Sequence, residues 1–117
     1  MHIVNAGALE QWKALSDEQV VARVLTGHTA MFELLMRRHT ERLYRTARAV
    51  TADDQEAEVV LLQGFLEAYG RLREFDGTHR FAVWLTRIVV REALAQVRRR
   101  SRHQLLTRPV ASLPEPL

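Results

Sequence analysis

Apolar residues recur at helical spacing through most of the chain and predict four helices, over about 17–26, 29–50, 53–74 and 80–102. Polar and charged residues fill the other positions of each segment, and no segment has the strict alternation of a strand. The expected inward-facing residues are Val20, Val21, Val24, Leu25, Phe32, Leu35, Met36, Leu43, Ala47, Val50, Ala57, Val60, Leu61, Gly64, Phe65, Ala68, Leu72, Phe75, Phe81, Trp84, Leu85, Ile88 and Val89. The chain is therefore predicted to be all-α, a compact bundle of about four amphipathic helices joined by short loops.

Local signals set the expected boundaries of these elements. Ser16 and Gln19 have the spacing of a capping box, and Gly27 is placed to end the first helix. The predicted organisation is an N-terminal extension at 1–15 with room for one short helix, a helical domain at 16–103, and a linker or flexible tail at 104–117.

The charge of the chain is concentrated in one segment. Residues 1–79 carry 9 basic and 12 acidic residues, whereas residues 80–102 carry 7 arginines and one acid, Glu92. A basic segment in an otherwise slightly acidic chain is typical of a protein that binds a polyanion. A smaller group of arginines on the second predicted helix is interpreted as a solvated face, with support of DNA or of a protein partner as the alternative. That group is Arg37, Arg38, Arg42, Arg45 and Arg48.

Five arginines of the basic segment fall within roughly 60° of one another if the last helix turns by about 100° per residue. They are Arg80, Arg87, Arg91, Arg98 and Arg102, and they define the arginine ridge; Arg99 and Arg100 are expected to widen its C-terminal end. Aligned guanidinium groups repel one another unless an anion lies opposite, and the phosphates of a nucleic acid meet that need. The alternative is a solvated helix with a basic end, but such a helix normally interleaves glutamate with arginine.

Aromatic residues lie next to the start of this ridge. Phe75 and His79 flank the loop before the last helix, and Phe81 and Trp84 open the helix itself. Aromatic faces can stack on unpaired bases, although Phe81 and Trp84 at this spacing are favoured as core residues. The donor groups of Thr78 and His79, together with the free amides of a helix N-terminus, could bind an anion or a base edge.

Other classes of protein are disfavoured by the sequence. There is no cysteine, and the five histidines lack metal-ligand spacing, so no metal and no cofactor is predicted. There is no glycine-rich phosphate loop and no nucleophile elbow, so the chain is not predicted to be an enzyme. No apolar run approaches a membrane span or a secretory signal, so the protein is expected to be cytoplasmic, without a membrane partner.

Three stretches taken together resemble region 2 of bacterial extracytoplasmic-function sigma factors. They are DEQVVARVLTGHTAMFELLMRRHTERLYRTARAV, AEVVLLQGFLEAYGRLREFDG and FDGTHRFAVWLTRIVVREALAQVRRRSR, and they span about residues 16–103. The resemblance implies that the domain binds RNA polymerase core and the non-template strand of the minus-ten promoter element, with one base flipped into a pocket at the loop before the last helix. The candidate DNA-binding residues, from the resemblance and the ridge, are Asp76, Gly77, Thr78, His79, Arg80, Phe81, Trp84, Arg87, Arg91 and Arg98.

The chain departs from this family in two ways. Polar residues that the family uses to bind polymerase are replaced by Val59, Leu62 and Gln63, so that Val59, Leu62 and Leu66 are expected to form an outward-facing apolar strip. The candidate polymerase- or partner-binding residues are Glu58, Val59, Leu62, Gln63 and Leu66. No helix-turn-helix fits after position 103, so region 4 is expected to be absent from this chain.

Two functions therefore stay open at this point. The first is promoter binding with RNA polymerase, in which the altered third helix puts ordinary polymerase binding in question. The alternative is a degenerate sigma-like protein that works by protein–protein contact, as a decoy, a subunit of a split factor or a module that binds an anti-sigma factor. An alternative for the apolar strip itself is packing against residues 1–15.

Overall fold

The structure is a computed structural model that describes residues 11–107, and all regular structure in that range is helical. The elements are α2 (Asp17–Leu25), the 3-10 turn η1 (Thr29–Met31), α3 (Phe32–Thr51), α4 (Asp54–Gly70), the 3-10 turn η2 (Leu72–Glu74) and α5 (Phe81–Thr107). This arrangement confirms the predicted all-α bundle. None of the helices in this range has the length and apolar character needed to cross a bilayer.

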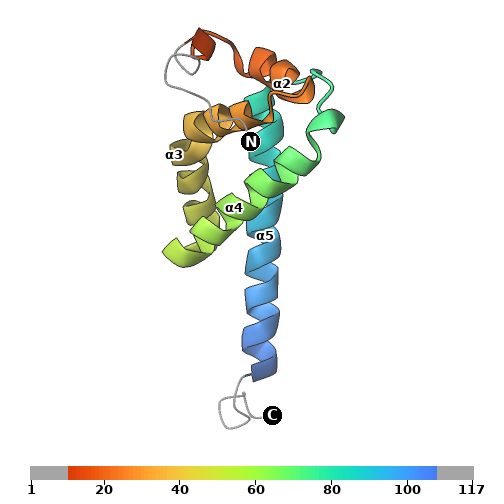
Figure 1. Ribbon diagram of the computed structural model, residues 1–117. Coiled ribbons are helices and arrows are strands. Elements are labelled where there is room, and N and C mark those ends of the chain that lie inside the picture. Colours follow the sequence, from red (N-terminus) through yellow and green to blue (C-terminus); the bar gives the residue numbers. More distant parts are fainter. Residues whose placement is uncertain (1–10, 108–117) are drawn as a thin grey trace, which may run out of the picture.

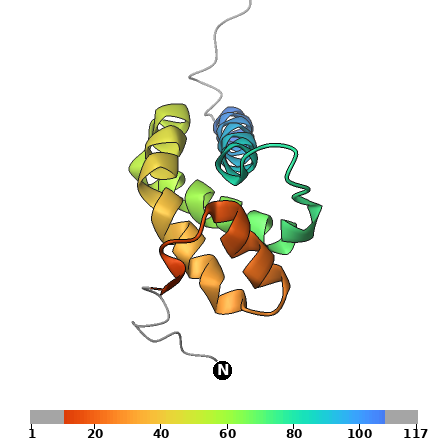
Figure 2. The same ribbon diagram turned by 90° about the horizontal axis from the view of Figure 1, so that it is seen from above.

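Three long helices form the body of the bundle. Helices α3, α4 and α5 pack pairwise on one another, with α4 running obliquely across the other two (Figure 1). Viewed along α5, α2 lies over one end of this layer, beside the start of α5 (Figure 2). Because α5 is 27 residues long, or about 40 Å, its C-terminal part extends beyond the other helices (Figure 1).

The core contains most of the residues that the periodicity predicted to face inward. Leu35, Leu43, Val60, Phe81 and Ile88 are fully buried at its centre. Helices α4 and α5 lie close together at Gly64, where an added Cβ would lie 2.8 Å from Cγ2 of Val89. A side chain at position 64 would therefore force the two helices apart or move a stiff β-branched residue.

The predicted helix signals at the start of the domain are confirmed. Ser16 caps α2 by accepting a hydrogen bond from the backbone N–H of Gln19 at 3.1 Å, and the Gln19 side chain accepts one from the N–H of Ser16 at 2.8 Å. Gly27 has a φ of +118°, which glycine adopts readily, and the chain turns there. Gln11 and Trp12 are helical and a turn follows them, whereas the rest of the proposed N-terminal helix lies outside the described residues.

Other boundaries differ from the prediction. The second and third segments each divide into a 3-10 turn and a longer helix, and α4 ends at Gly70 rather than near position 74. Residues 104–107, predicted to belong to the linker, continue α5 to Thr107, and the remainder of that segment lies outside the described residues. The helix continues through these positions because glutamine and leucine favour the helical conformation.

Candidate nucleic-acid interface

The arginine ridge is present on the exposed side of α5. Arg80, Arg87, Arg91, Arg98 and Arg102 are all exposed, and none of their guanidinium groups forms an ion pair or hydrogen bond with another residue in the range 11–107. Five positive charges thus follow the length of one helix without a paired counter-charge in the described part of the chain. This arrangement leaves them available to anions in solution.

The predicted widening of the ridge by Arg99 and Arg100 is wrong. Arg99 pairs with Glu92 at 3.2 Å and bonds to Gln96, on its own helix. Arg100 points toward the bundle instead, where it donates to the backbone oxygen of Thr51 at 2.8 Å and pairs closely with Glu56. Arg100 is nine residues after Arg91, which at about 100° per residue places it on the opposite side of α5. Adjacency in sequence to Arg98 therefore did not imply a shared face.

A groove lies beside the ridge at the level of its second and third arginines. Its volume is about 490 Å³, within the range of roughly 300–1,000 Å³ typical of small-molecule sites. The lining residues are Arg71, Trp84, Thr86, Arg87, Val90 and Arg91. An aromatic ring and three guanidinium groups around one hollow can hold a planar base together with its phosphate.

The loop before α5 is organised by its own side chains. One oxygen of Asp76 accepts hydrogen bonds from the backbone N–H of Thr78, at 2.9 Å, and from the Thr78 hydroxyl. These bonds, the one from the hydroxyl first, lower the pKa of Asp76 below its ordinary value. Gly77 has a φ of +79°, which suits glycine at the tip of this turn. Thr78, His79 and Arg80 are exposed, so the predicted base-reading loop is accessible to a ligand.

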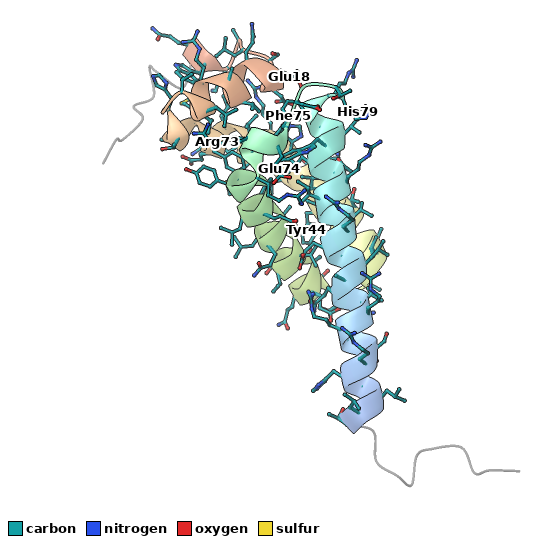
Figure 3. All side chains as sticks on the ribbon, turned by 90° about the vertical axis from the view of Figure 1, so that its right-hand side faces the viewer. Glu18, Tyr44, Arg73, Glu74, Phe75 and His79 are labelled. Atoms are coloured by element: carbon teal, nitrogen blue, oxygen red, sulfur yellow. The ribbon has the colours of Figure 1, made fainter. Side chains whose placement is uncertain are left out.

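The N-terminus of α5 is less open than predicted. The backbone N–H of Phe81 donates to Oε2 of Glu18 at 2.8 Å, so a carboxylate from α2 already occupies an amide that was expected to be free. Phe81 itself is fully buried and offers no surface to a base in this conformation, which corrects its assignment as a DNA-binding residue. Figure 3 shows Glu18, Phe75 and His79 gathered around this end of α5.

Phe81 belongs to an aromatic cluster beneath the loop. Its ring centroid lies 5.6 Å from that of Phe75 and 5.7 Å from that of Trp84, and Phe75 lies 5.6 Å from Trp84. Trp84 is only partly buried and also lines the groove, so it joins the core to the candidate site. The cluster therefore fixes the position of the ring that a base could stack on.

The arginines of α3 are all engaged within the protein. Arg37, Arg45 and Arg48 pair with Glu33, Glu41 and Asp54. Arg38 donates to Asp17 and to backbone oxygens at the start of the domain. The less favoured interpretation, that these arginines contact DNA, thus has less support than the same role for the ridge, whose guanidinium groups have no partner among residues 11–107.

His39 and Arg42 of α3 connect three helices through hydrogen bonds. Nε2 of the buried His39 lies 2.9 Å from Asp17 on α2, and Nδ1 of His39 lies 2.9 Å from Nη2 of Arg42. Arg42 in turn donates to the hydroxyl of Thr86 on α5 at 2.7 Å. The bond from His39, with help from Arg38, lowers the pKa of Asp17, so a charged carboxylate anchors this network. The network holds α2, and with it Glu18, against the start of α5.

The outer face of α4 forms a second candidate surface. Val59, Leu62 and Leu66 are 50%, 55% and 58% exposed, as the departure from the family pattern predicted. Tyr69 extends the row by one turn and is 45% exposed, a residue that the sequence reasoning missed although it follows at helical spacing. Glu58 and Gln63 flank the row and are also exposed.

Some functional candidates could not be found from the sequence. Arg71 comes from the end of α4 and reaches the groove on α5, where Glu67 and Glu74 hold its guanidinium group. Glu18 and Phe81 are 63 residues apart, and no local pattern connects them. Both contacts, that of Arg71 with the groove and that of Glu18 with Phe81, depend on how the helices pack. For the candidate DNA-binding site, the sequence therefore indicated only the spacing of arginines along α5.

Comparison with known proteins agrees with this geometry. The family model described as Sigma-70 region 2 matches residues 35–103. The chain is 34% identical over 77 residues to the RNA polymerase sigma-H factor of Pseudomonas aeruginosa, covering 66% of this chain and 40% of that protein. It is 32% identical over 88 residues to the ECF RNA polymerase sigma factor SigM of Mycobacterium tuberculosis, covering 75% of this chain and 45% of that protein.

The chain thus spans less than half the length of the curated relatives that it matches. The matched residues include most of α3, all of α4, the loop before α5 and most of α5, which together carry both candidate surfaces. The chain belongs to the Sigma-70 region 2 family.

Proposed function

We propose that this chain binds promoter DNA as the region 2 part of a sigma factor and holds the opened non-template strand of the minus-ten element along α5. The observation that carries the proposal is the arginine ridge, which has no ion-pair partner within residues 11–107 and runs past a groove lined by Trp84, Arg87 and Arg91. By their names, the similar proteins sigma-H factor and SigM are RNA polymerase sigma factors. We place this activity in the cytoplasm, where promoter DNA and polymerase meet.

The physical argument starts from the backbone of the DNA. From Arg80 to Arg102 the ridge follows the helix axis for roughly 33 Å, long enough to contact several successive phosphates. A base that leaves the duplex loses stacking energy of a few kcal/mol. Stacking on Trp84 would return about 1–3 kcal/mol, and polar contacts from Thr78 and His79 would add to it. The loop thereby supplies selectivity, and the ridge supplies affinity.

The test is a double substitution in the groove. Replacing Arg87 and Arg91 by alanine should weaken binding to a single-stranded minus-ten oligonucleotide, because two phosphate contacts are lost. The slope of log affinity against log salt should fall by about 1.4, since each contact with single-stranded DNA contributes about 0.7. Fluorescence anisotropy across a salt series measures both quantities.

A matched control removes the same charge elsewhere. Arg37 and Arg45 lie on α3, are well exposed, and make only surface pairs with neighbouring glutamates. The double variant Arg37→Ala, Arg45→Ala should keep a salt slope close to that of the wild type. If the two double variants lose affinity equally, net charge alone accounts for the binding and the role of the groove is rejected.

RNA polymerase core is the proposed protein partner, through the outer face of α4. Because apolar residues replace the polar ones that the resemblance leads us to expect there, binding should be weaker than for a typical member. The variant Val59→Asp, Leu62→Gln, Gln63→Glu should bind polymerase core more tightly in a pull-down or by biolayer interferometry. Unchanged or weaker binding would contradict the assignment of this face to polymerase.

A second candidate function is supported by the same face. Three aliphatic side chains and Tyr69, each about half exposed, form a row typical of a protein–protein contact. The chain could then work as a decoy, as a subunit of a split factor or as the binding module for an anti-sigma factor. In that case the Arg87→Ala, Arg91→Ala variant would retain its activity in transcription assays, whereas substitution of Leu62 would abolish it.

A further inference from the structure

The outer face of α4 carries an apolar row whose two ends have opposite charges. We call Val59, Leu62, Leu66 and Tyr69 the α4 strip; their spacing of three, four and three residues keeps them on one side of the helix. Each is between 45% and 58% exposed, so no helix within residues 11–107 covers the strip. It follows the helix axis for about 15 Å.

The charges at the two ends have no partner within the described part of the chain. Glu58 directly precedes Val59 at the N-terminal end of the strip. Arg73 lies just beyond the C-terminal end of α4 (Figure 3). Both are exposed, and neither forms an ion pair with a residue in the range 11–107. The other charged residues nearby are already paired: Asp54 with Arg48, Glu56 with Arg100, and Arg71 with Glu67 and Glu74.

This pattern is self-complementary when a second α4 is laid antiparallel on the first. Val59 then lies opposite Tyr69 of the other copy, and Leu62 lies opposite Leu66. The same operation brings Glu58 of each copy within about one helical turn of Arg73 of the other. We propose that a second copy of this chain covers the α4 strip in an antiparallel two-fold dimer. A two-fold axis repeats each contact, so four apolar side chains of each copy are covered and two ion pairs form at once.

The size of the strip sets the strength of the association. Stable interfaces use about 20–30 residues from each partner, whereas the strip and its flanks offer about ten. Dimerisation should therefore be weak, with a dissociation constant of roughly 10–100 μM. An association in that range responds to protein concentration and can be displaced by a tighter partner.

The dimer also bears on polymerase binding, and this part rests on the function proposed above. Glu58, Val59, Leu62 and Leu66 are candidates for the polymerase contact and would be covered by the second copy. Self-association would then compete with polymerase. Dimerisation is measured without polymerase, so a failure of the dimer and a failure of the proposed function are separate results.

The first experiment is sedimentation equilibrium of the full chain over a concentration series. The wild type should shift from monomer to dimer, and Leu62→Asp should weaken the association at least tenfold. Leu94→Asp is the control, because Leu94 is also 45% exposed but lies on α5. Circular dichroism confirms that both variants are folded. A wild type that stays monomeric to about 1 mM, or equal effects of the two substitutions, would overturn the proposal.

Charge reversal tests the arrangement of the two copies. Glu58→Arg and Arg73→Glu should each weaken the dimer severalfold, because each places like charges opposite one another. The double variant should restore affinity to near the wild-type value, because the pairs re-form with the charges exchanged. A double variant as weak as the sum of the single changes would exclude this pairing.

Cysteine cross-linking tests whether the two α4 helices are antiparallel. Because the sequence contains no cysteine, only the introduced cysteines can form a disulfide. Position 55 should face position 73 of the other copy. An equal mixture of Gln55→Cys and Arg73→Cys chains should form a mixed disulfide under mild oxidation, whereas either variant alone should form little. Efficient linking of Gln55→Cys to itself would indicate a parallel dimer and overturn the antiparallel arrangement.

Discussion

The contact between Glu18 and the start of α5 leads to a prediction with two opposite effects. The carboxylate of Glu18 accepts a hydrogen bond from the backbone N–H of Phe81 at 2.8 Å, in a partly buried position. Replacing Glu18 by alanine removes a charged cap from a helix N-terminus, which typically lowers the free energy of unfolding by about 1–2 kcal/mol. For a domain of this size the melting temperature should fall by roughly 5–10 °C.

The same substitution should strengthen DNA binding. Glu18 places a negative charge beside the loop that is proposed to read a base, where it repels phosphate. At a separation of about 10 Å in water, that repulsion amounts to roughly 0.4 kcal/mol, or about a twofold change in affinity. Urea denaturation followed by circular dichroism measures the first effect. Fluorescence anisotropy with a single-stranded oligonucleotide, well below the melting temperature, measures the second.

Glu41→Ala is the matched control. Glu41 is 87% exposed and makes only a surface pair with Arg45, so its loss should change the free energy of unfolding by less than about 0.5 kcal/mol. Glu18→Gln, which keeps an acceptor but loses the charge, should lie between the two. The reasoning is refuted if Glu18→Ala is as stable as Glu41→Ala, or if it binds the oligonucleotide more weakly than the wild type.

Three further predictions concern packing, pH and backbone conformation. Gly64→Ala should lower the free energy of unfolding by roughly 1–3 kcal/mol, because the new Cβ would meet Val89 at 2.8 Å. Chemical denaturation should show partial rescue of that loss in the double variant with Val89→Ala, whereas additive losses would contradict this contact. The bond from His39 lowers the pKa of Asp17 below 3.8, so its stabilising effect is present above that value and is lost as the pH falls through the lowered pKa. The stability difference between wild type and Asp17→Asn should accordingly shrink in denaturation measured below about pH 4, and a difference independent of pH would count against it. Ala52 has a φ of +59°, so Ala52→Gly should raise the free energy of unfolding by up to about 1 kcal/mol in thermal melts, and a lower melting temperature would be the contrary result.

The features predictable from sequence are those that repeat at helical spacing. Leu35, Leu43, Leu85 and Ile88 were expected inside and are fully buried, because burial of one face is what makes such a pattern stable as a helix. The direction of the arginine ridge followed from the same geometry, since a long helix keeps its turn per residue whatever surrounds it. The exposed positions of α4 were predictable for that reason as well.

The features that were missed depend on contacts between distant segments. Arg100 was expected to extend the ridge, yet its long side chain reaches the carbonyl of Thr51, which no local rule identifies. The burial of Phe81 was expected from its spacing, but its additional placement among the DNA contacts is wrong because no part of its side chain is exposed. The end of α3 was expected at Val50 and lies at Thr51, because Ala52 takes a left-handed conformation more commonly found in glycine.

The missing side chain at Gly64 has a mechanical consequence. Because Gly64 has no side chain, Val89 of α5 packs directly against the backbone of α4. Such close packing couples the two helices, so that a displacement of one is expected to move the other. The α4 strip and the arginine ridge thus lie on two helices that move together. A protein bound to the α4 strip would therefore be held at a fixed distance and angle from DNA bound along the arginine ridge.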